Sequence, residues 1–322
     1  MSLFSLSGRL LFCCLLLLSS NICCAETTAD SVAKLQLIRA LELESDASIS
    51  GLQPSGLAFC DGQLLMVSDR HNQQIFSLQL TAESAQVVPF LTLTAIPDPD
   101  LEGYDLDTRW WNQLSRRYDW EGVSCDKQGN IYLLSETLAQ VLVRDKDGVL
   151  AWLGTEAYQR GQEKGLFQQI NAYAEGLAVV GEQMVIAAER HPRGILLLNV
   201  NEDKRWRVSR VKYLEGFPSL FRPVDFSGLW LESDWLYTLE RNYFQICKRQ
   251  LATLDSQRCW QYRHVEEDQR WIYQDRRFGK AEGLARNGNQ IYLVLDNNDG
   301  SRLSDPDNSK PLLFIFQRPD DW

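Results

Sequence analysis

Histidine is scarce in this sequence, which has three: His71, His191 and His264. None of them accompanies a nucleophile motif such as G-x-S-x-G, and the sequence contains no C-x-x-C or H-x-x-x-H spacing. Catalysis by a Ser-His-Asp triad and coordination of zinc depend on such arrangements. The composition therefore argues against a nucleophilic triad and against a zinc site.

Basic residues and long apolar runs are also in short supply. The chain has 33 lysines and arginines against 43 acidic residues, and no segment reaches the ~20 consecutive apolar residues of a membrane-spanning helix. An acidic protein is repelled by nucleic acid and by anionic lipid surfaces. We therefore expect no nucleic acid among its partners and no membrane span, whereas a cation is easy to accommodate.

One short apolar run stands near the N-terminus. Leu10–Leu18 follows Arg9 and precedes a polar stretch that ends at Ala25. Such a run is too short to cross a bilayer and is typical of a secretory signal peptide. We predict a signal peptide over residues 1–25 and a single mature domain over residues 26–322, located in the periplasm or secreted.

Cleavage after Ala25 would leave a net charge of −11, because residues 1–25 contain one arginine and no acid. The alternative to cleavage at this point is a lipid anchor on Cys23 or Cys24. Asn21 and Ile22 stand where a lipoprotein signal would have a leucine and a small residue, which argues against the anchor.

A unit built around one glycine recurs five times along the chain. The glycines are 52 to 66 residues apart: Gly56, Gly122, Gly176, Gly228 and Gly283. Each follows a small or acidic residue and begins a strand-like run, which leads through a turn and a second strand-like run to a closing acid: Asp69, Glu136, Glu189, Glu240 or Asp296. The layout predicts hairpins, and the spacing is close to that of propeller blades.

The fold that we predict is all-β, a single β-propeller of four-stranded antiparallel blades. The units indicate five blades, and six are possible if a degenerate unit lies in a linker. No linker rich in proline, glycine or serine divides the mature chain, and stacked blades allow one domain to be this long. Lys34–Leu43 and Pro311–Phe316 are strand-like without hairpin partners, so we expect them to close the ring.

Acidic residues recur at both ends of each predicted hairpin. The first strand of an antiparallel pair begins where the second ends, so the residue before the glycine and the closing acid meet at one edge. A closed ring would gather these acids around one mouth of the channel: Glu121, Glu175, Glu282, Asp69, Glu136, Glu189, Glu240 and Asp296. Such oxygen ligands suit a hard cation. The alternative is that these acids only form turns and recur because a blade was duplicated.

Arginine directly follows three of the closing acids, at Arg70, Arg190 and Arg241. Side chains alternate along a strand, so we expect each arginine to point away from the acid before it. The arginines would then serve neighbouring loops or bind a phosphate.

Four cysteines follow the predicted cleavage site, an even number that allows disulfides in an oxidising compartment. Cys247 and Cys259 lie on two strand-like runs that flank a turn, which predicts a disulfide across that hairpin. Cys60 and Cys125 occupy nearly the same place in the first two units. They could be neighbours in adjacent blades or two buried free thiols.

The motifs of the units together resemble those of a known bacterial family. They are Ser55-Gly56-Leu57 with Ser68-Asp69-Arg70, Trp120-Glu121-Gly122-Val123 with Ser135-Glu136, Ala174-Glu175-Gly176-Leu177 with Ala188-Glu189-Arg190, Leu239-Glu240-Arg241, and Ala281-Glu282-Gly283-Leu284 with Leu295-Asp296-Asn297-Asn298. The family is called esterase-like activity of phytase, and the resemblance runs from about Gly51 to Phe316. It implies a secreted or periplasmic propeller that hydrolyses phosphate or carboxylate esters.

The chain departs from the Glu-Gly pattern at Ser55 and Ser227, which reduces the number of acids expected at the mouth. A neighbouring propeller group, the SdiA-regulated family, shares the Glu-Gly motif and is our second choice.

Two functions fit these residues. In the first, calcium-assisted hydrolysis of a phosphoester, the metal ligands are Glu121, Glu175, Glu189 and Glu282. The catalytic residues are Glu175, Glu189, Arg190 and Arg241, of which an arginine neutralises the phosphate. The remaining ligand-binding residues are Asp69, Arg70, Glu136, Glu240, Asp296 and Asn297. In the second, a non-catalytic propeller binds a polar ligand or an envelope protein. For both we expect a monomer, and for the enzyme a small anionic or polar substrate.

Overall fold

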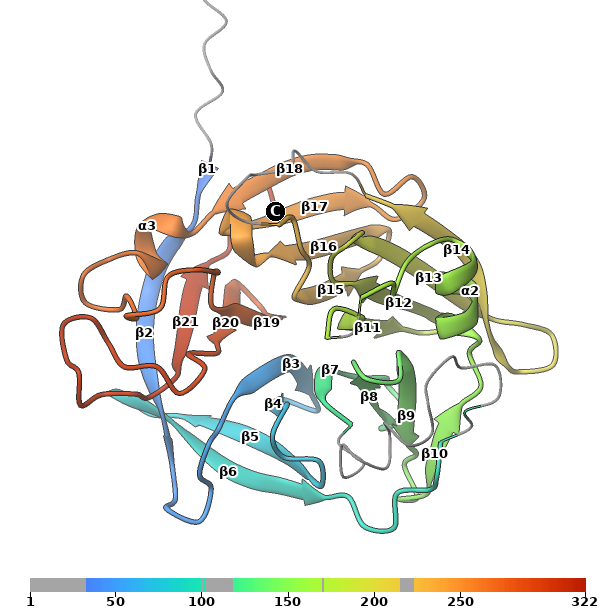
Figure 1. Ribbon diagram of the computed structural model, residues 1–322, viewed down its shortest axis with the longest axis horizontal. Helices are drawn as coiled ribbons and strands as arrows, with labels where there is room; N and C mark the ends of the chain where they lie inside the picture. The colour runs from blue at the N-terminus through green and yellow to red at the C-terminus, as the bar shows by residue number, and fades with distance from the viewer. Residues whose placement is uncertain (1–32, 100, 102–117, 170, 215–222) are drawn as a thin grey trace, which may run out of the picture. The chain divides into compact units, whose positions relative to one another are not determined.

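The computed structural model describes residues 33–99, 101, 118–169, 171–214 and 223–322. The predicted signal peptide, residues 1–25, lies outside these ranges. Most of the described elements are strands (Figure 1), and the helical elements are short: α2 (Ala157–Glu163), η1 (Arg241–Tyr243, a 3-10 turn) and α3 (Arg263–Glu266). None of the helices in the described part of the chain is long and apolar enough to cross a bilayer.

The first three units each form four antiparallel strands in chain order. The first unit contains β3 (Pro54–Cys60), β4 (Gln63–Ser68), β5 (Gln74–Leu80) and β6 (Ser84–Thr92). The second contains β7 (Trp120–Cys125), β8 (Ile131–Ser135), β9 (Gln140–Arg144) and β10 (Leu150–Leu153). The third contains β11 (Ala174–Val180), β12 (Gln183–Ala188), β13 (Gly194–Val200) and β14 (Trp206–Tyr213).

The turns between strands have the predicted chemistry. Asp61 and Gly62 join β3 to β4 with φ angles of 48° and 78°. Two successive positive φ angles are what a two-residue hairpin turn needs to match the twist of its strands.

The last two units contain the remaining hairpins. The fourth contains β15 (Gly228–Glu232), β16 (Trp235–Glu240), β17 (Gln245–Gln250) and β18 (Ser256–Gln261). The fifth contains β19 (Ala281–Asn287), β20 (Gln290–Leu295) and β21 (Leu312–Gln317).

The fourth strand of the fifth unit comes from the N-terminal part of the chain. β2 (Gln36–Ser45) pairs antiparallel with β21 over Gln36–Glu42 and then runs parallel to β6 over Glu42–Ser45. The two strand-like segments expected to pair therefore do so. Through β2, the sheets of the fifth and first units join into one of eight strands, while β1 (Ala33–Lys34) pairs in parallel with β18.

Apolar side chains gather between neighbouring units. The described residues form five buried clusters, and each cluster takes its members mainly from two successive units, or from the fifth and the first. Leu177 of β11 shares a cluster with Tyr132 of β8, and Leu57 of β3 shares one with Tyr292 of β20. Side chains alternate along a strand, so each strand can contribute to the cluster on either side.

The first strand of each unit lies nearest the centre (Figure 1). β3 contacts β7, β7 contacts β11, β11 contacts β15, β15 contacts β19, and β19 contacts β3. Glycine permits this approach: a Cβ on Gly56 would lie 2.8 Å from the Cα of Gly122, and one on Gly283 would collide with the carbonyl oxygen of Ser55. The fold is an all-β propeller built from four-stranded antiparallel units.

Two disulfides link strands. Cys247 and Cys259 face each other on β17 and β18 and form one of them. Cys60 and Cys125 form the other, which joins β3 to β7 in the next unit. Of the two alternatives for this second pair, the structure therefore has neighbouring cysteines in a covalent bond.

Candidate functional site: an acidic mouth lined by arginines

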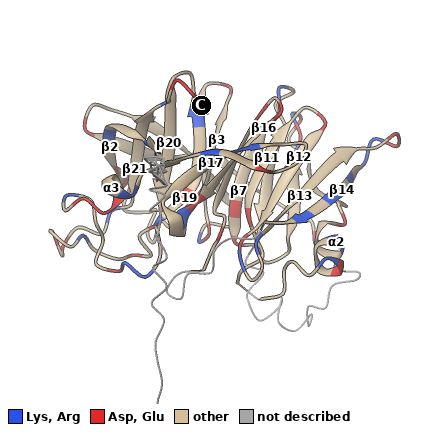
Figure 2. Ribbon diagram, turned by 90° about the horizontal axis from the view of Figure 1, so that it is seen from above, with Lys and Arg blue, Asp and Glu red and all other residues tan. Residues whose placement is uncertain are grey.

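One cavity of about 370 Å³ collects residues from all five units. We call it the acidic mouth. Its charged lining residues are Asp69, Arg70, Asp119, Glu121, Glu136, Glu175, Arg190, Arg241, Lys280, Glu282 and Asp296. Figure 2 colours acidic residues red, among them those of the inner strands β7, β11 and β19. Seven carboxyl groups and four basic groups therefore share one small space.

In three of the units, a β-bulge determines the position of the residue that precedes the recurring glycine. The pairing register skips Glu121 in β7, Glu175 in β11 and Glu282 in β19. A bulged residue stands outside the regular pairing, so the bulge can aim its side chain away from the sheet face. All three glutamates line the acidic mouth.

Main-chain hydrogen bonds hold the closing acids beside these glutamates. In four units, the N–H of the closing acid donates to the carbonyl oxygen of the residue three positions before the glycine: Asp69 to Gln53 (3.3 Å), Glu136 to Asp119 (2.9 Å), Glu189 to Tyr173 (2.8 Å) and Asp296 to Lys280 (2.7 Å). The fourth unit has a different contact, from the N–H of Ser227 to the carbonyl oxygen of Leu239 at 3.1 Å. The repeated contact explains why acids of four units reach the mouth or its immediate surroundings.

The carboxylates form two groups of three, and in each group oxygens from all three residues lie within 4.8 Å of one another. The first triad is Asp69, Asp119 and Glu121, which are partly buried. The second triad is Glu136, Glu175 and Glu189, which are buried. Oxygen donors at this spacing match the chemistry of a hard cation such as calcium. The buried acidic groups therefore fit a metal.

The four residues predicted to bind one metal do not form a single group in the structure. Glu121 lies in the first triad, and Glu175 and Glu189 lie in the second. Glu282 forms an ion pair with Arg241 instead. Glu136, predicted only as a ligand-binding residue, joins the second triad.

Arg241 is at the centre of the ion pairs. Its Nε donates to Oδ2 of Asp225 at 2.8 Å, and its two terminal nitrogens pair with Glu282 and Glu189. Burial would lower the pKa of this guanidinium, but the three carboxylates of Glu282, Asp225 and Glu175 raise it well above its ordinary value. Arg241 therefore carries a fixed positive charge among the acids.

The expectation that each arginine points away from the acid before it is wrong for Arg70 and Arg190, which contact Asp69 and Glu189. It holds for Arg241, because the preceding Glu240 pairs with Arg193 and Arg249 instead. Arg70, Arg190 and Arg241 all line the acidic mouth. The alternation of side chains does not apply because β4, β12 and β16 have ended before these positions. Arg190 also donates to the carbonyl oxygen of Asn171 at 3.0 Å.

Nε of Arg70 donates a hydrogen bond to the side-chain oxygen of Gln53 at 2.8 Å. The same nitrogen lies 3.8 Å from Asp69. Its side chain is about half exposed, so Arg70 remains accessible to a ligand from solvent.

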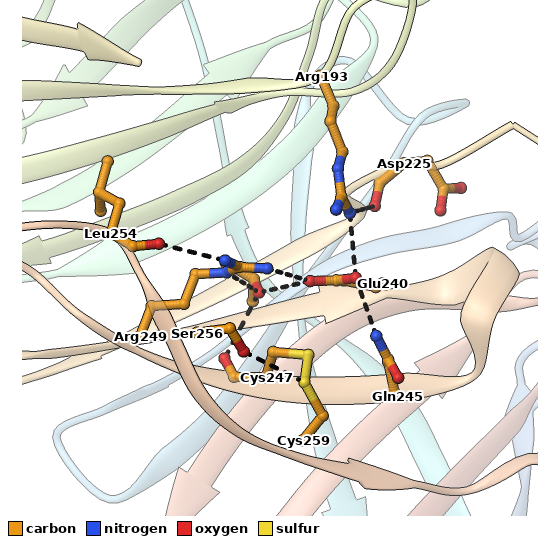
Figure 3. Close-up of a disulfide and its surroundings, with 10 residues drawn as sticks. Arg193, Asp225, Glu240, Gln245, Cys247, Arg249, Leu254, Ser256 and Cys259 are labelled. Atoms are coloured by element: carbon orange, nitrogen blue, oxygen red, sulfur yellow. Dashed lines mark hydrogen bonds and ion pairs between the residues drawn. A yellow bond between two sulfur atoms is a disulfide. The ribbon is translucent and has the colours of Figure 1, made fainter. Parts of the chain in front are cut away.

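Glu240 does not line the mouth, contrary to our prediction. Figure 3 shows its buried carboxylate between Arg193 and Arg249, at 3.0 and 2.6 Å, and close to the Cys247–Cys259 disulfide. The different main-chain contact of the fourth unit accompanies this departure, and the two arginines account for the direction of the side chain.

Glu189, predicted at the mouth, is buried and outside the cavity lining, and so is Asn297. The side-chain nitrogen of Asn297 donates to the carbonyl oxygens of Gly300 (2.7 Å) and Ser309 (2.6 Å). The next residue, Asn298, lines the mouth in its place. Asn297 thus shapes the loop that follows β20.

Burial raises the pKa of the carboxyl groups in the mouth, and neighbouring carboxylates contribute. The increase takes the pKa well above the ordinary value in three residues: Glu121, Glu136 and Glu282. Burial raises the pKa of Glu175 to about 7, although Arg241 and Arg190 oppose the increase. Burial likewise raises the pKa of Asp296 to about 6. A positive ligand would relieve this crowding of acids.

Three residues of this site were missed by the sequence reasoning. Asp119 and Lys280 line the cavity, and Asp225 binds Arg241 beneath it. All three stand three positions before a recurring glycine. A motif that began three residues before each glycine would have included them.

None of the curated proteins matches this chain. Solved structures similar to it include glutaminyl cyclase from Myxococcus xanthus, with 14% identity, 89% of this chain and 97% of that chain covered, and a TM-score of 0.53. An aldose sugar dehydrogenase from Streptomyces coelicolor has 11% identity, coverage of 88% and 98%, and a TM-score of 0.46. Virginiamycin B lyase from Staphylococcus aureus has 11% identity, coverage of 87% and 74%, and a TM-score of 0.40.

At this identity the similarity to glutaminyl cyclase concerns the fold alone. The family model described as esterase-like activity of phytase, in contrast, matches residues 48–299. That span contains all five recurring glycines and the acids that close their units. The chain therefore belongs to the phytase-like family described as esterase-like activity of phytase.

Proposed function

We propose that this propeller hydrolyses a phosphoester in the acidic mouth with the help of a calcium ion. The observation that carries the proposal is the cavity itself, which is lined by Arg70, Arg190 and Arg241 and by every member of the two carboxylate triads except Glu189. The buried side chain of Glu189 pairs with Arg190 and Arg241. Carboxylates suit a hard cation, and arginines suit a phosphate. The family description, which names esterase-like activity, supports the same reaction class.

We assign a role to each residue from its exposure and its contacts. Calcium, when bound, would offset the charge that develops on the phosphoryl group. Arg190 and Arg70, with one-fifth and one-half of their side chains exposed, would bind and orient the phosphate. Arg241 has three carboxylate partners, so it would position Glu189 and Glu282. A carboxylate of the first triad would accept the proton of the attacking water.

Turnover of a simple phosphomonoester, 4-nitrophenyl phosphate, tests this function. Protein treated with a chelator should be inactive and should regain activity with calcium. Arg190→Gln should lower kcat/KM by roughly a hundredfold, because it removes a charged contact with the phosphate. Arg205→Gln, in the exposed turn before β14, is the matched control and should leave kcat/KM unchanged. Failure of folded wild-type protein to hydrolyse any phosphoester with any divalent cation would refute the proposal.

A non-catalytic binding propeller is the second candidate. Arg241 already pairs with Asp225, Glu189 and Glu282, and such internal ion pairs would also suit a surface that holds a polar ligand or an envelope protein. Binding of such a ligand to the wild type without turnover would favour this function.

Five blades and an exported location are part of the proposal. The cyclic order of contacts among β3, β7, β11, β15 and β19 supports five blades, and the pairing of β2 with β21 supports closure by the two terminal segments. Two disulfides are typical of an oxidising compartment. We expect a mature chain of residues 26–322, and the mass of the exported protein distinguishes it from a lipid-anchored form.

A further inference from the structure

We propose that the second triad, Glu136, Glu175 and Glu189, is the binding site of a single divalent cation of the calcium class. The inference rests on the proposed function and locates the metal within it. It replaces the set expected from the sequence, in which Glu121 and Glu282 were ligands and Glu136 was not.

The main chain of one residue, Tyr173, contacts two of the three ligand residues. The N–H of Tyr173 donates to Oε1 of Glu136 at 3.2 Å, while the carbonyl oxygen of Tyr173 accepts from the N–H of Glu189 at 2.8 Å. The third ligand, Glu175, is the bulged residue of the strand that begins one residue after Tyr173. The three ligand residues therefore meet around Tyr173, at the start of β11.

Glu189 provides an independent indication of a bound cation. Its side chain is fully buried, and its Oε1 pairs with Arg241 and Arg190. Its Oε2 is buried and has no hydrogen-bond partner in the described part of the chain. A buried carboxylate oxygen without a partner is costly, and a cation would satisfy it.

The spacing of the triad agrees with one ion. Calcium binds oxygens at about 2.3 to 2.6 Å, so two of its ligands can be up to about 5 Å apart. One oxygen from each of the three glutamates lies within 4.8 Å of the others. The other candidates do not meet these conditions together: Glu282 belongs to neither group of three, and the first triad is more exposed.

Calorimetric titration of calcium into chelator-treated, full-length protein tests the site. Wild type should bind one ion. Glu136→Gln retains an oxygen that can accept from Tyr173, so the variant should fold, and it should bind calcium roughly tenfold or more weakly. Glu121→Gln changes the first triad in the same way and should shift the dissociation constant less than about threefold. Glu83→Gln, at an exposed turn, controls for net charge.

Circular dichroism verifies that each variant is folded. Absence of calcium binding up to about 1 mM, the weak end of protein calcium sites, would overturn the inference. So would an equal loss of affinity in Glu121→Gln and Glu136→Gln. Calcium binding that depends on Glu136 in a protein without phosphoesterase activity would support this site and refute the proposed reaction.

Discussion

Glu240 and Arg241 are adjacent in the chain, yet their side chains belong to different charge groups. Arg241 enters the acidic mouth, whereas Glu240 lies between Arg193 and Arg249. Burial would raise the pKa of Glu240, but its two arginine partners lower it below the ordinary value. The carboxylate therefore stays charged, and the two buried guanidinium groups depend on it.

Replacing Glu240 with glutamine should destabilise the protein. The substitution removes the charged carboxylate that Arg193 and Arg249 share, and removing one partner of a buried ion pair costs about 3 to 5 kcal/mol. The free energy of unfolding, measured by urea denaturation, checks the prediction. Glu182→Gln is the control, because Glu182 meets Lys204 at 3.7 Å in an exposed pair that contributes less than about 1 kcal/mol. Similar losses in both variants would contradict the prediction.

Asp296 should make the folded protein more stable at mildly acidic pH. Its pKa is about 6 in the folded protein against an ordinary value of 3.8, so the folded state holds the proton more tightly than the unfolded state. The group therefore contributes stability that is absent above about pH 6 and is gained as the pH falls toward 3.8. The gain is at most about 3 kcal/mol.

The measurement is urea denaturation with a chelator present at about pH 7.5 and about pH 4.5, a range that spans the titration. Asp296→Asn cannot titrate, so its free energy of unfolding should change less with pH than that of the wild type. Asp147→Asn, at an exposed turn, should keep the pH dependence of the wild type. An unchanged pH dependence in Asp296→Asn would show that Asp296 is not the source.

Among the elements, the bulges at the start of β7, β11 and β19 connect the repeat to the site. Each bulge lies beside the recurring glycine where neighbouring inner strands meet. Packing between units and the direction of the site glutamates therefore depend on the same few residues.

Gly283→Ala tests this dependence at the contact between β19 and β3. The added Cβ would collide with the carbonyl oxygen of Ser55, and the backbone shift should cost about 1 to 3 kcal/mol. It should also disturb Glu282, the neighbouring residue. Gly154→Ala is the control, because a Cβ there meets nothing within 4 Å. Thermal denaturation compares the two variants. An equal midpoint would mean that β19 and β3 can move apart without loss of stability.

The recurring pattern was sufficient to predict the hairpins and most of the acids at the mouth. Local spacing carries this information, since a glycine, a turn and a closing acid repeat within each unit. The family match over residues 48–299 confirms the family predicted from these motifs, and the four-stranded antiparallel sheets confirm the predicted all-β propeller class. Glu121, Glu175 and Glu282 were placed correctly at the mouth because their position before the glycine is fixed in every unit.

The pairing of charges could not be predicted from that pattern. Glu240 turns away because Arg193 and Arg249 lie beside it, and these arginines come from positions that do not recur. Arg241 turns inward because its strand ends at Glu240 and Asp225 lies within reach. Such contacts depend on three-dimensional proximity between units, which one sequence does not contain.

For the molecule as a whole, the two disulfides should differ in their effect on stability. Cys60–Cys125 spans 65 residues and joins two units, whereas Cys247–Cys259 spans 12 within one hairpin. Constraining a longer loop lowers the entropy of the unfolded chain more, by about 1.5 kcal/mol for these lengths.

The double variant Cys60→Ser/Cys125→Ser should therefore unfold at a lower denaturant concentration than Cys247→Ser/Cys259→Ser. Denaturation of both variants and the wild type without reductant provides the comparison. A larger loss from the hairpin pair would indicate that local strain or native packing, rather than the loop, determines the effect.

β2 lies between β6 from the first unit and β21 near the end of the chain, so the order of synthesis determines when this sheet can form. It is among the first strands to be made, but its antiparallel partner β21 begins at Leu312. A ribosome must therefore complete nearly the whole polypeptide before this seam can form. Until then β2 lacks its antiparallel partner, so the seam between the first and fifth units is among the last parts of the sheet structure that can form.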